Sequence, residues 1–365
     1  MIKPLSEIIQ ELTINNSDSL LNALKKMDDV GRKLLIVLSN ENKFINLISI
    51  GDIQRAILND TDLKESLCNV DIDKKLVMFE PATINEVQNK ILELRCEFMP
   101  ILDDSNNITN IYFWNDLFSH KEIQDNRKLS LPVVIMAGGK GTRLKPISNV
   151  LPKPLTPIGE STIVEEIMKR FSSFGCLRFY LSVNYKKELI QYYLENNTEF
   201  NDIKYFVEDK PLGTAGSLSL LKGKISEPFF VTNCDILIEQ DLAELYEYHK
   251  VNNNEITMVA ALKHIPIAYG TVKTKENGLL DSMQEKPEMT FKINAGVYIL
   301  EPHLLDQIPE NTFFHITELI ENVRAKGGRV GVYPISEKSW MDIGEWPEYI
   351  KTVRALSSAV TFKGL

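Results

Sequence analysis

The chain has 365 residues, enough for two or three domains, and 44% hydrophobic and 25% charged residues, as in ordinary globular proteins. Its formal net charge of −9 argues against a nucleic-acid-binding protein, and no apolar run is long enough to cross a bilayer. The four cysteines are scattered, without a Cys-x-x-Cys pair, which is typical of reduced thiols. We therefore expect a cytoplasmic protein that binds neither nucleic acid nor membranes.

An internal repeat occupies the first third of the chain. A shift of 64 residues places Val37 on Ile101 and Asp52 on Asp116 without a gap. In each copy the apolar spacing predicts a helix, two strands joined by a turn, and a second helix. In the first copy we expect the helix at residues 19–27, the strands at 34–38 and 44–48, and the second helix from about residue 51.

The two copies resemble a tandem pair of cystathionine β-synthase (CBS) domains over residues 1–122. In that family a Ser or Thr and, three residues later, an Asp bind an adenosine ribose, so the resemblance implies a ligand site at Ser49 and Asp52. The second copy keeps Asp116 but has Phe113 in place of the Ser or Thr. Asp is also a common helix cap, so both interpretations remain open. The resemblance further implies a regulatory nucleotide and a homo-oligomer.

The predicted order of secondary structure changes after a polar, charged segment at residues 123–130, which we expect to be a linker. In residues 131–365 strands and helices alternate. This alternation predicts an α/β fold with a mostly parallel, Rossmann-like sheet covered on both faces, and ligands beyond the carboxyl ends of the strands. We expect strands at 133–136, 179–183, 203–207, 229–232 and 256–262, and helices at 163–174, 187–195, 215–221 and 242–251.

A glycine loop follows the first of these strands. The absence of side chains lets backbone N–H groups approach an anion, and cations surround the loop, so the segment predicts a polyphosphate site. It lacks the P-loop pattern, and Leu144 stands where a dinucleotide-binding loop needs its third glycine. The glycines are Gly138, Gly139 and Gly141, and the cations are Lys140, Arg143, Lys145 and Lys153.

The sequence Gly-Gly-x-Gly-Thr-Arg-Leu, followed by Pro152-Lys153-Pro154, resembles the sugar-1-phosphate nucleotidyltransferases, whose domain is GT-A-like. The resemblance implies in-line attack of a sugar-1-phosphate oxygen on the α-phosphorus of a nucleoside triphosphate, with release of pyrophosphate. Fixed cations, backbone donors and Mg²⁺ would stabilise the charge that develops. It also implies catalytic roles for Arg143 and Lys153, and nucleotide contacts from Ala137, Gly138, Gly139, Gly141 and Thr142.

The other motifs of this family follow in order along the chain. Asp235, after a buried strand, and Asp342, before a helix, would bind the Mg²⁺, which prefers oxygen ligands. The Glu-Lys-Pro motif at residues 285–287 would bind the sugar phosphate, with Lys286 also catalytic. The full set of sugar-phosphate contacts implied by the resemblance is Asn184, Tyr269, Gly270, Glu285, Lys286 and Asn294.

The base and the sugar follow from two further resemblances. The segment from Glu208 through Gly213 and Thr214 resembles that of GDP-mannose pyrophosphorylases and heptose-phosphate guanylyltransferases, which implies GTP. Glu208, or backbone carbonyls of this segment, would accept the adjacent N1–H and N2–H₂ donors of guanine. A CBS pair ahead of a short transferase is similar to the glucosamine-1-phosphate guanylyltransferases of bacterial legionaminic acid synthesis. Glucosamine 1-phosphate is therefore favoured, with mannose 1-phosphate and a heptose 1-phosphate open.

A hypothesis of a different class is a nucleotide sensor, in which the CBS pair acts and the transferase is an inactive scaffold. The complete set of motif residues argues against it, because a scaffold has no need of Arg143, Lys153, Asp235, Lys286 and Asp342.

Overall fold

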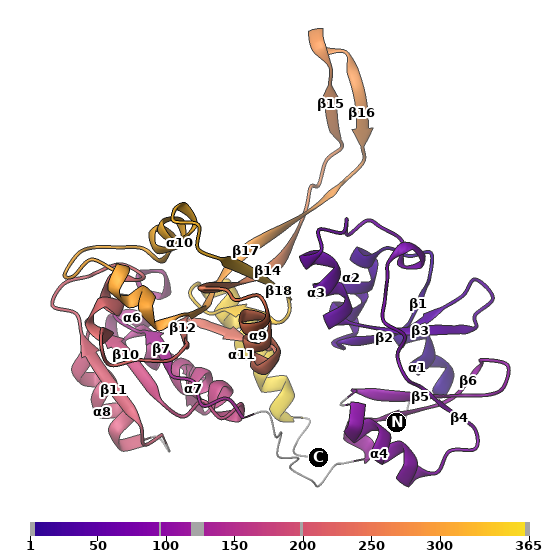
Figure 1. Ribbon diagram of the computed structural model, residues 1–365, viewed down its shortest axis with the longest axis horizontal. Coiled ribbons are helices and arrows are strands. Elements are labelled where there is room, and N and C mark those ends of the chain that lie inside the picture. The colour runs from indigo at the N-terminus through magenta and orange to yellow at the C-terminus, as the bar shows by residue number, and fades with distance from the viewer. Residues whose placement is uncertain (1–3, 95, 118–127, 198–199, 362–365) are drawn as a thin grey trace. The chain divides into compact units, whose positions relative to one another are not determined.

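The computed structural model describes residues 4–94, 96–117, 128–197 and 200–361. The chain divides into two compact units, Met1–Gln124 and Asp125–Leu365 (Figure 1), and each is described by itself. Residues 123–127 of the expected linker lie outside the described residues.

The N-terminal unit contains two three-stranded sheets, ordered β1-β2-β3 and β4-β5-β6. Helices α2 and α3 contact each other beside the first sheet, and α4 contacts the second. The elements are α1 (Leu5–Leu12), β1 (Thr13–Asn15), α2 (Leu20–Val30), β2 (Leu34–Leu38), β3 (Phe44–Ser49), α3 (Ile50–Leu58), β4 (Met78–Phe79), α4 (Ile84–Leu94), β5 (Phe98–Leu102), β6 (Ile108–Phe113) and α5 (Trp114–Leu117).

The strands of the two copies follow the same register. Strands β2 and β3 recur as β5 and β6 after the same shift of 64 residues, and both pairs have a bulge at the equivalent position. Residues at equivalent positions of the two copies also form hydrogen bonds with each other. The backbone N–H of Lys33 donates to the carboxylate of Glu97, and Lys43 Nζ donates to Asn107 Oδ1 at 2.7 Å. Contacts between equivalent residues indicate that the copies are related by an approximate two-fold axis.

The C-terminal unit is built on a seven-stranded sheet of order β11-β10-β7-β12-β17-β14-β18. Only β17 runs antiparallel to its neighbours in this sheet, so the predicted mostly parallel arrangement is confirmed. Its strands are β7 (Val133–Met136), β10 (Phe179–Val183), β11 (Ile203–Val207), β12 (Phe229–Asn233), β14 (Ile256–Pro266), β17 (Glu288–Leu300) and β18 (Val330–Ser336).

Helices cover both faces of this sheet, because the strand residues that point to either face are apolar. Val133 and Ile135 pack in one cluster with α7, α8 and α9, whereas Val134 packs in another with α10. The remaining elements of the unit are α6 (Ile147–Val150), β8 (Pro157–Ile158), β9 (Ser161–Thr162), α7 (Ile163–Ser173), α8 (Lys187–Asn197), β13 (Ile236–Ile238), α9 (Leu242–Val251), β15 (Thr271–Thr274), β16 (Leu280–Gln284), α10 (Ile316–Ala325), β19 (Trp340–Asp342) and α11 (Trp346–Thr361).

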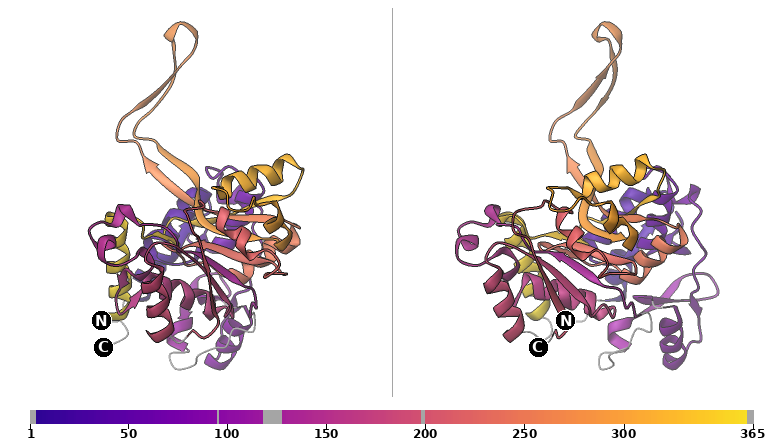
Figure 2. Two further views of the ribbon diagram at one scale, coloured as in Figure 1. Left: turned by 90° about the vertical axis from the view of Figure 1, so that its left-hand side faces the viewer. Right: turned by 60° about the vertical axis from the view of Figure 1, so that its left-hand side comes forward.

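Two features differ from the expectation. The helix expected at 215–221 is a 3₁₀ helix at Gly216–Leu221, where the hydroxyl of Ser219 donates to the carbonyl of Gly216 at 2.7 Å. Such side-chain bonds compete with α-helical pairing. In addition, β14 and β17 continue past the sheet and lead into the ribbon β15–β16, an arm that projects from the unit (Figure 2).

Candidate functional site

A cavity of about 440 Å³ lies at the carboxyl ends of β7 and β12, where ligands of such sheets are expected. Its walls come from the glycine loop, from the loop after β11, from the end of β12 and the residues after it, from the chain before α10 and from the chain after β19. The predicted residues that line it are Gly138, Gly139, Gly141, Thr142, Arg143, Lys153, Glu208, Gly213, Thr214 and Asp235.

Two glycines of the loop are required by close packing. A Cβ on Gly138 would lie 2.7 Å from Glu208 Oε1, so the loop can pass this carboxylate only without a side chain. Gly141 has a left-handed φ of +61°, and a Cβ there would lie 2.9 Å from Cβ of Lys153. The loop therefore connects the Glu208 side of the cavity with Lys153.

Lys153 and Asp235 form an ion pair in the wall of the cavity, and both side chains are buried. Asp235 immediately precedes β13, which pairs with β19 so that Ile236 lies opposite Asp342. The N–H of Gly344 donates to Asp342 Oδ1 at 2.7 Å and fixes that carboxylate. Two short strands, which begin at Ile236 and Trp340 and so are far apart in the chain, thus bring both predicted metal ligands to one place.

The two carboxylates fit a divalent cation. A Cβ on Gly344 would lie 2.6 Å from Asp235 Oδ2 and 2.8 Å from Asp342 Oδ1, so both oxygens converge on one point. Burial raises the pKa of Asp342, and the neighbouring Asp235 carboxylate acts in the same direction. The described residues contain no cluster of three or more carboxylate, His or Cys ligands. A cation here would complete its shell with water or phosphate oxygens, as Mg²⁺ commonly does.

Arg143 lies at the open edge of the cavity. Its guanidinium donates to Glu345 Oε1 at 2.9 Å, and this hydrogen bond raises the pKa of Arg143. The side chain is largely exposed, so it stays charged and can turn towards a polyphosphate.

Glu208 holds the loop after β11 in place. Its buried carboxylate accepts hydrogen bonds from the hydroxyl of Ser182 at Oε1 and from the N–H of Leu212 at Oε2, the latter at 3.1 Å. Asn184 Nδ2 donates to the carbonyl of Glu208 at 2.5 Å. Asn184 thus stabilises the loop through its backbone. It is not among the described residues that line the cavity.

The same loop is docked on the segment before α10. Gly213 has a φ of +81°, and a Cβ there would lie 2.7 Å from the carbonyl oxygen of Phe314. Thr214 Oγ1 accepts a hydrogen bond from the N–H of Ile316 at 2.9 Å. These contacts fix the distance between the predicted base loop and residues 312–316.

Two cavity residues in that segment escaped the sequence analysis. Phe313 is 57% exposed and packs edge-on against His315, with 4.8 Å between ring centroids, and both rings line the cavity. Exposed aromatic rings beside a nucleotide cavity are suited to stack on a base. Nothing in the local pattern marks them, because their position depends on the docking of Gly213. Gly344 was likewise missed, although it follows Asp342 by two residues.

Other predicted residues are not among the described residues that line the cavity. Ala137 is buried and its N–H donates to the carbonyl of Ser182, as a continuation of the sheet. Asn294 pairs with the hydroxyl of Tyr298 and with the N–H of Gly296. The remaining predicted sugar-phosphate contacts lie on the arm and are exposed: Tyr269, Gly270, Glu285 and Lys286. Their roles stay predictions.

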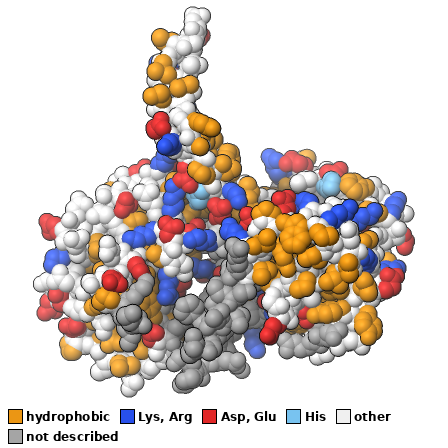
Figure 3. Space-filling view, turned by 180° about the vertical axis from the view of Figure 1, so that it is seen from behind, with side chains coloured by type: hydrophobic (Ala, Val, Ile, Leu, Met, Phe, Trp, Pro, Cys, Tyr) orange, Lys and Arg blue, Asp and Glu red, His pale blue; other side chains and the backbone are white. Residues whose placement is uncertain are grey.

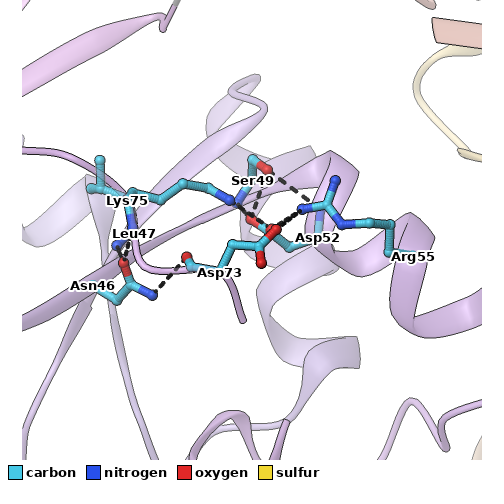
Figure 4. A network of polar contacts seen from close by, with 7 residues as sticks. All are labelled: Asn46, Leu47, Ser49, Asp52, Arg55, Asp73 and Lys75. Carbon is cyan, nitrogen blue, oxygen red and sulfur yellow. Dashed lines mark hydrogen bonds and ion pairs between the residues drawn. The ribbon is translucent and has the colours of Figure 1, made fainter. Parts of the chain in front are cut away.

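In the N-terminal unit, Asp52 is the centre of a polar network (Figure 4). Its Oδ2 accepts from the N–H and the hydroxyl of Ser49, both at 2.7 Å, which completes a capping box at the start of α3. Its Oδ1 pairs with Arg55 and, at 2.7 Å, with Lys75 Nζ. The structure thus shows Asp52 as a cap, and its nucleotide role remains a prediction. Asp116 is exposed in the first turn of α5.

None of the described helices combines the length and the apolar composition that a membrane span requires.

Comparison with known proteins adds three findings. The sequence model of the family "Nucleotidyl transferase" matches residues 132–359, and that of the CBS domain matches residues 5–59. A probable mannose-1-phosphate guanylyltransferase 1 of Oryza sativa subsp. japonica is 32% identical over 233 residues, which are 61% of this chain and 64% of that protein. The mannose-1-phosphate guanyltransferase of Yarrowia lipolytica is 35% identical over 226 residues, 60% of this chain and 61% of that protein.

The chain thus covers less than two thirds of the length of either relative. Among solved structures, HddC from Yersinia pseudotuberculosis is similar with 26% identity and a TM-score of 0.49, over 62% of this chain and 99% of that one.

Proposed function

The chain belongs to the nucleotidyl transferase family, and from this premise we propose that it transfers GMP from GTP to a sugar 1-phosphate, giving a GDP-sugar and pyrophosphate. One observation carries the proposal: Asp235, Asp342 and Lys153 converge beside Gly344 at the phosphate side of a cavity that the glycine loop lines. An inactive scaffold would not need to bury a carboxylate and a lysine beside a second, half-buried carboxylate.

The proposed reaction breaks one bond and forms one. An oxygen of the sugar phosphate attacks the α-phosphorus, and the bond from that phosphorus to the oxygen bridging to the β-phosphorus breaks, so pyrophosphate leaves. Lys153 and Arg143 stabilise the negative charge on the phosphates, and N–H groups of the glycine loop hold the nucleotide. Asp235 and Asp342 would hold Mg²⁺, which supplies Lewis-acid stabilisation of the phosphate oxygens when bound.

The base is proposed to be guanine, as in the names of the relatives. Both oxygens of Glu208 already accept bonds from Ser182 and Leu212, so Glu208 is proposed to order the loop, and the loop's backbone carbonyls to accept the guanine donors. The exposed ring of Phe313 is proposed to stack on the base.

The experiment that tests the reaction measures pyrophosphate released from GTP, UTP, dTTP, CTP and ATP with a panel of sugar 1-phosphates. Glucosamine 1-phosphate stays our prediction from domain architecture, mannose 1-phosphate is the substrate in the relatives' names, and a heptose 1-phosphate completes the panel. The result expected is turnover with GTP in preference to the other triphosphates. Absence of turnover with every sugar, or a preference for another base, would contradict the proposal.

A variant separates the two roles of Glu208. Glu208→Gln keeps a side-chain oxygen for the N–H of Leu212, so loop ordering predicts a modest fall in kcat/KM that is similar for GTP and ATP. Direct reading of guanine by the carboxylate predicts instead a selective loss for GTP, about 10- to 100-fold. A selective loss would therefore assign base recognition to Glu208 itself. Ser182→Ala is the matched control, because it removes a partner of the carboxylate and leaves its charge.

A further inference from the structure

The wall of the cavity includes a histidine to which the proposed function gives no role. The chain has five histidines, and His315 is the only one among the described residues that line the cavity. On the face of the molecule in Figure 3, histidine side chains (pale blue) are rare beside the charged ones. The ring of His315 stands at 84° to that of Phe313, so one base cannot lie flat on both. With Phe313 proposed to stack, His315 is left to contribute its ring nitrogens.

Two neighbouring groups direct protons towards Nδ1 of His315. Thr214 Oγ1 lies 3.3 Å from Nδ1, and it already accepts the N–H of Ile316 at 2.9 Å, so its own proton is free to be donated. The ring also takes part in the capping box of α10, where it faces the N–H of Glu318, a group that can only donate. This hydrogen-bond network makes Nδ1 an acceptor and assigns the ring proton to Nε2.

The Nε2–H group is a donor that is available to a ligand. Nε2 forms no hydrogen bond with the residues that the structure describes, and His315 is exposed in the cavity wall. Because His315 lies against Thr214, this donor stands at the end of the loop after β11. The carbonyls of that loop are proposed to accept N1–H and N2–H₂ of guanine. The wall thus offers acceptors and, beside them, one donor.

The base edge of guanine has the complementary pattern. It presents the donors N2–H₂ and N1–H and, next to N1–H, the acceptor O6. Adenine has the donor N6–H₂ in the place of O6, so Nε2–H would face another donor there. A site that forms a hydrogen bond with one base rejects a base that leaves its polar group unpaired. A donor in this position therefore favours guanine over adenine.

We propose that His315 is a specificity-determining residue that recognises O6 of the guanine base through Nε2–H, and that Thr214 is a positioning residue that holds the ring in this tautomer. The inference rests on the proposed function, because it takes GTP as the nucleotide. It also adds to that function, because the loop carbonyls can recognise only the donors of the base.

Two variants of His315 that differ in where they place a donor test the proposal. The amide of His315→Asn reaches about as far as Nδ1, so it keeps a cap on α10 and removes the donor at Nε2. The amide of His315→Gln reaches about as far as Nε2 and keeps a donor there. Pyrophosphate release by the full chain gives kcat/KM for three triphosphates: GTP, ITP, which keeps O6 and lacks the 2-amino group, and 2-aminopurine riboside triphosphate, which lacks O6 and N1–H.

The expected result is a loss that depends on O6. His315→Asn should lower kcat/KM about 10-fold for GTP and ITP and leave the value for the 2-aminopurine nucleotide unchanged. His315→Gln should keep more of the activity with GTP than His315→Asn does. An equal fall for all three nucleotides would make His315 a structural residue and overturn the proposal, as would an unchanged value for GTP. A His315→Gln chain no better than His315→Asn would overturn the assignment to Nε2.

The wild-type chain separates this inference from the proposed function. Turnover of GTP by the wild type, with uniform losses in His315→Asn, would overturn base recognition by His315 and leave the proposed function standing. A wild type that prefers another base would overturn both. A wild type without any turnover would overturn the proposed function, and calorimetric titration of GTP and the 2-aminopurine nucleotide then tests His315 by itself. An affinity loss in His315→Asn for GTP alone supports the proposal, and an equal loss for both nucleotides overturns it.

Discussion

Lys153 and Asp235 form an ion pair inside the candidate active site, with about nine-tenths of each side chain buried. The pair joins the 3₁₀ turn at Lys153–Leu155 to the chain between β12 and β13. In this position the ammonium neutralises one carboxylate, while Asp342 Oδ1 lies beside the same point next to Gly344. A ligand that brings phosphates and a cation would give both charges new partners.

The first prediction concerns this pair. Asp235→Asn is expected to lower turnover at least about 100-fold, because it removes a carboxylate from the proposed cation site. It should also lower the free energy of unfolding by about 3 kcal/mol, because Lys153 is left buried without its counter-charge. Pyrophosphate release and urea unfolding measure the two effects.

The double variant Lys153→Met with Asp235→Asn is the control for that prediction. It is expected to regain part of the stability, because neither charge remains unpaired, but none of the activity. An Asp235→Asn enzyme that keeps wild-type turnover would show that Asp235 has no part in the reaction.

Gly344 gives a second prediction. A methyl group there would crowd Asp235 and Asp342 at 2.6 and 2.8 Å, so Gly344→Ala should reduce kcat about 100-fold while the chain stays folded. Gly223→Ala is the control: it has open space but a φ of +70°, so it should cost about 1 kcal/mol of stability and leave kcat unchanged. Equal turnover in Gly344→Ala and the wild type would mean that the two carboxylates do not act at that point.

The elements that the sequence predicted well are those defined by local patterns. The strands at 34–38, 179–183 and 203–207 are short apolar runs between turn residues, and their bounds agree with the structure. The helix expected from residue 163 begins there as α7, where Thr162 and Glu165 form a capping box and the N–H of Thr162 donates to Glu165 Oε2 at 2.7 Å. Such signals lie within a few residues of each other, so one sequence is enough to recognise them.

The features that were missed depend on contacts between distant segments. The arm was not predicted, because Thr271–Thr274 is short and half polar and becomes a strand through pairing with Leu280–Gln284. Phe313 reaches the cavity only because Gly213 packs against the neighbouring Phe314. The sequence motifs identified Asp235 and Asp342 as candidate metal ligands, but the two carboxylates come together only through the pairing of β13 with β19.

A third prediction concerns the N-terminal unit. Titration of an adenine mononucleotide into the full chain is expected to release heat with the wild type and with Asp116→Asn, but not with Asp52→Asn. Asp52 lies among Lys75, Arg55 and Ser49, a set of cations and donors that can also bind a phosphate and a ribose (Figure 4).

The capping role of Asp52 requires a parallel measurement. Asp52→Asn should lower the stability of the N-terminal unit by about 1 kcal/mol through the weakened cap, so unfolding of each variant is measured beside the titration. Heat of equal size from the wild type and a folded Asp52→Asn chain would exclude the site. Absence of heat from the wild type would leave Asp52 as a helix cap.

The last prediction is a pH dependence of stability that arises at His249. This side chain is 1% exposed, with Nδ1 2.8 Å from Thr257 Oγ1 and Nε2 3.2 Å from Glu301 Oε1. Burial lowers its pKa below the ordinary value of 6.5, although the Glu301 hydrogen bond opposes the shift. As the pH falls below 6.5, the unfolded chain therefore binds a proton that the folded chain does not bind.

His249 thus contributes stability above pH 6.5 and loses it as the pH falls towards the lowered pKa of the folded state, by at most about 1.4 kcal/mol per pH unit. Urea unfolding at pH 7.5, 6.5 and 5.5 should show a smaller acid loss for His249→Gln than for the wild type. His303→Gln, which changes an exposed histidine of the same unit, is measured beside it as the control for the substitution itself. The same slope in His249→Gln and the wild type would mean that His249 takes up its proton equally well in the folded chain, and that burial among Thr257 and Glu301 does not exclude it.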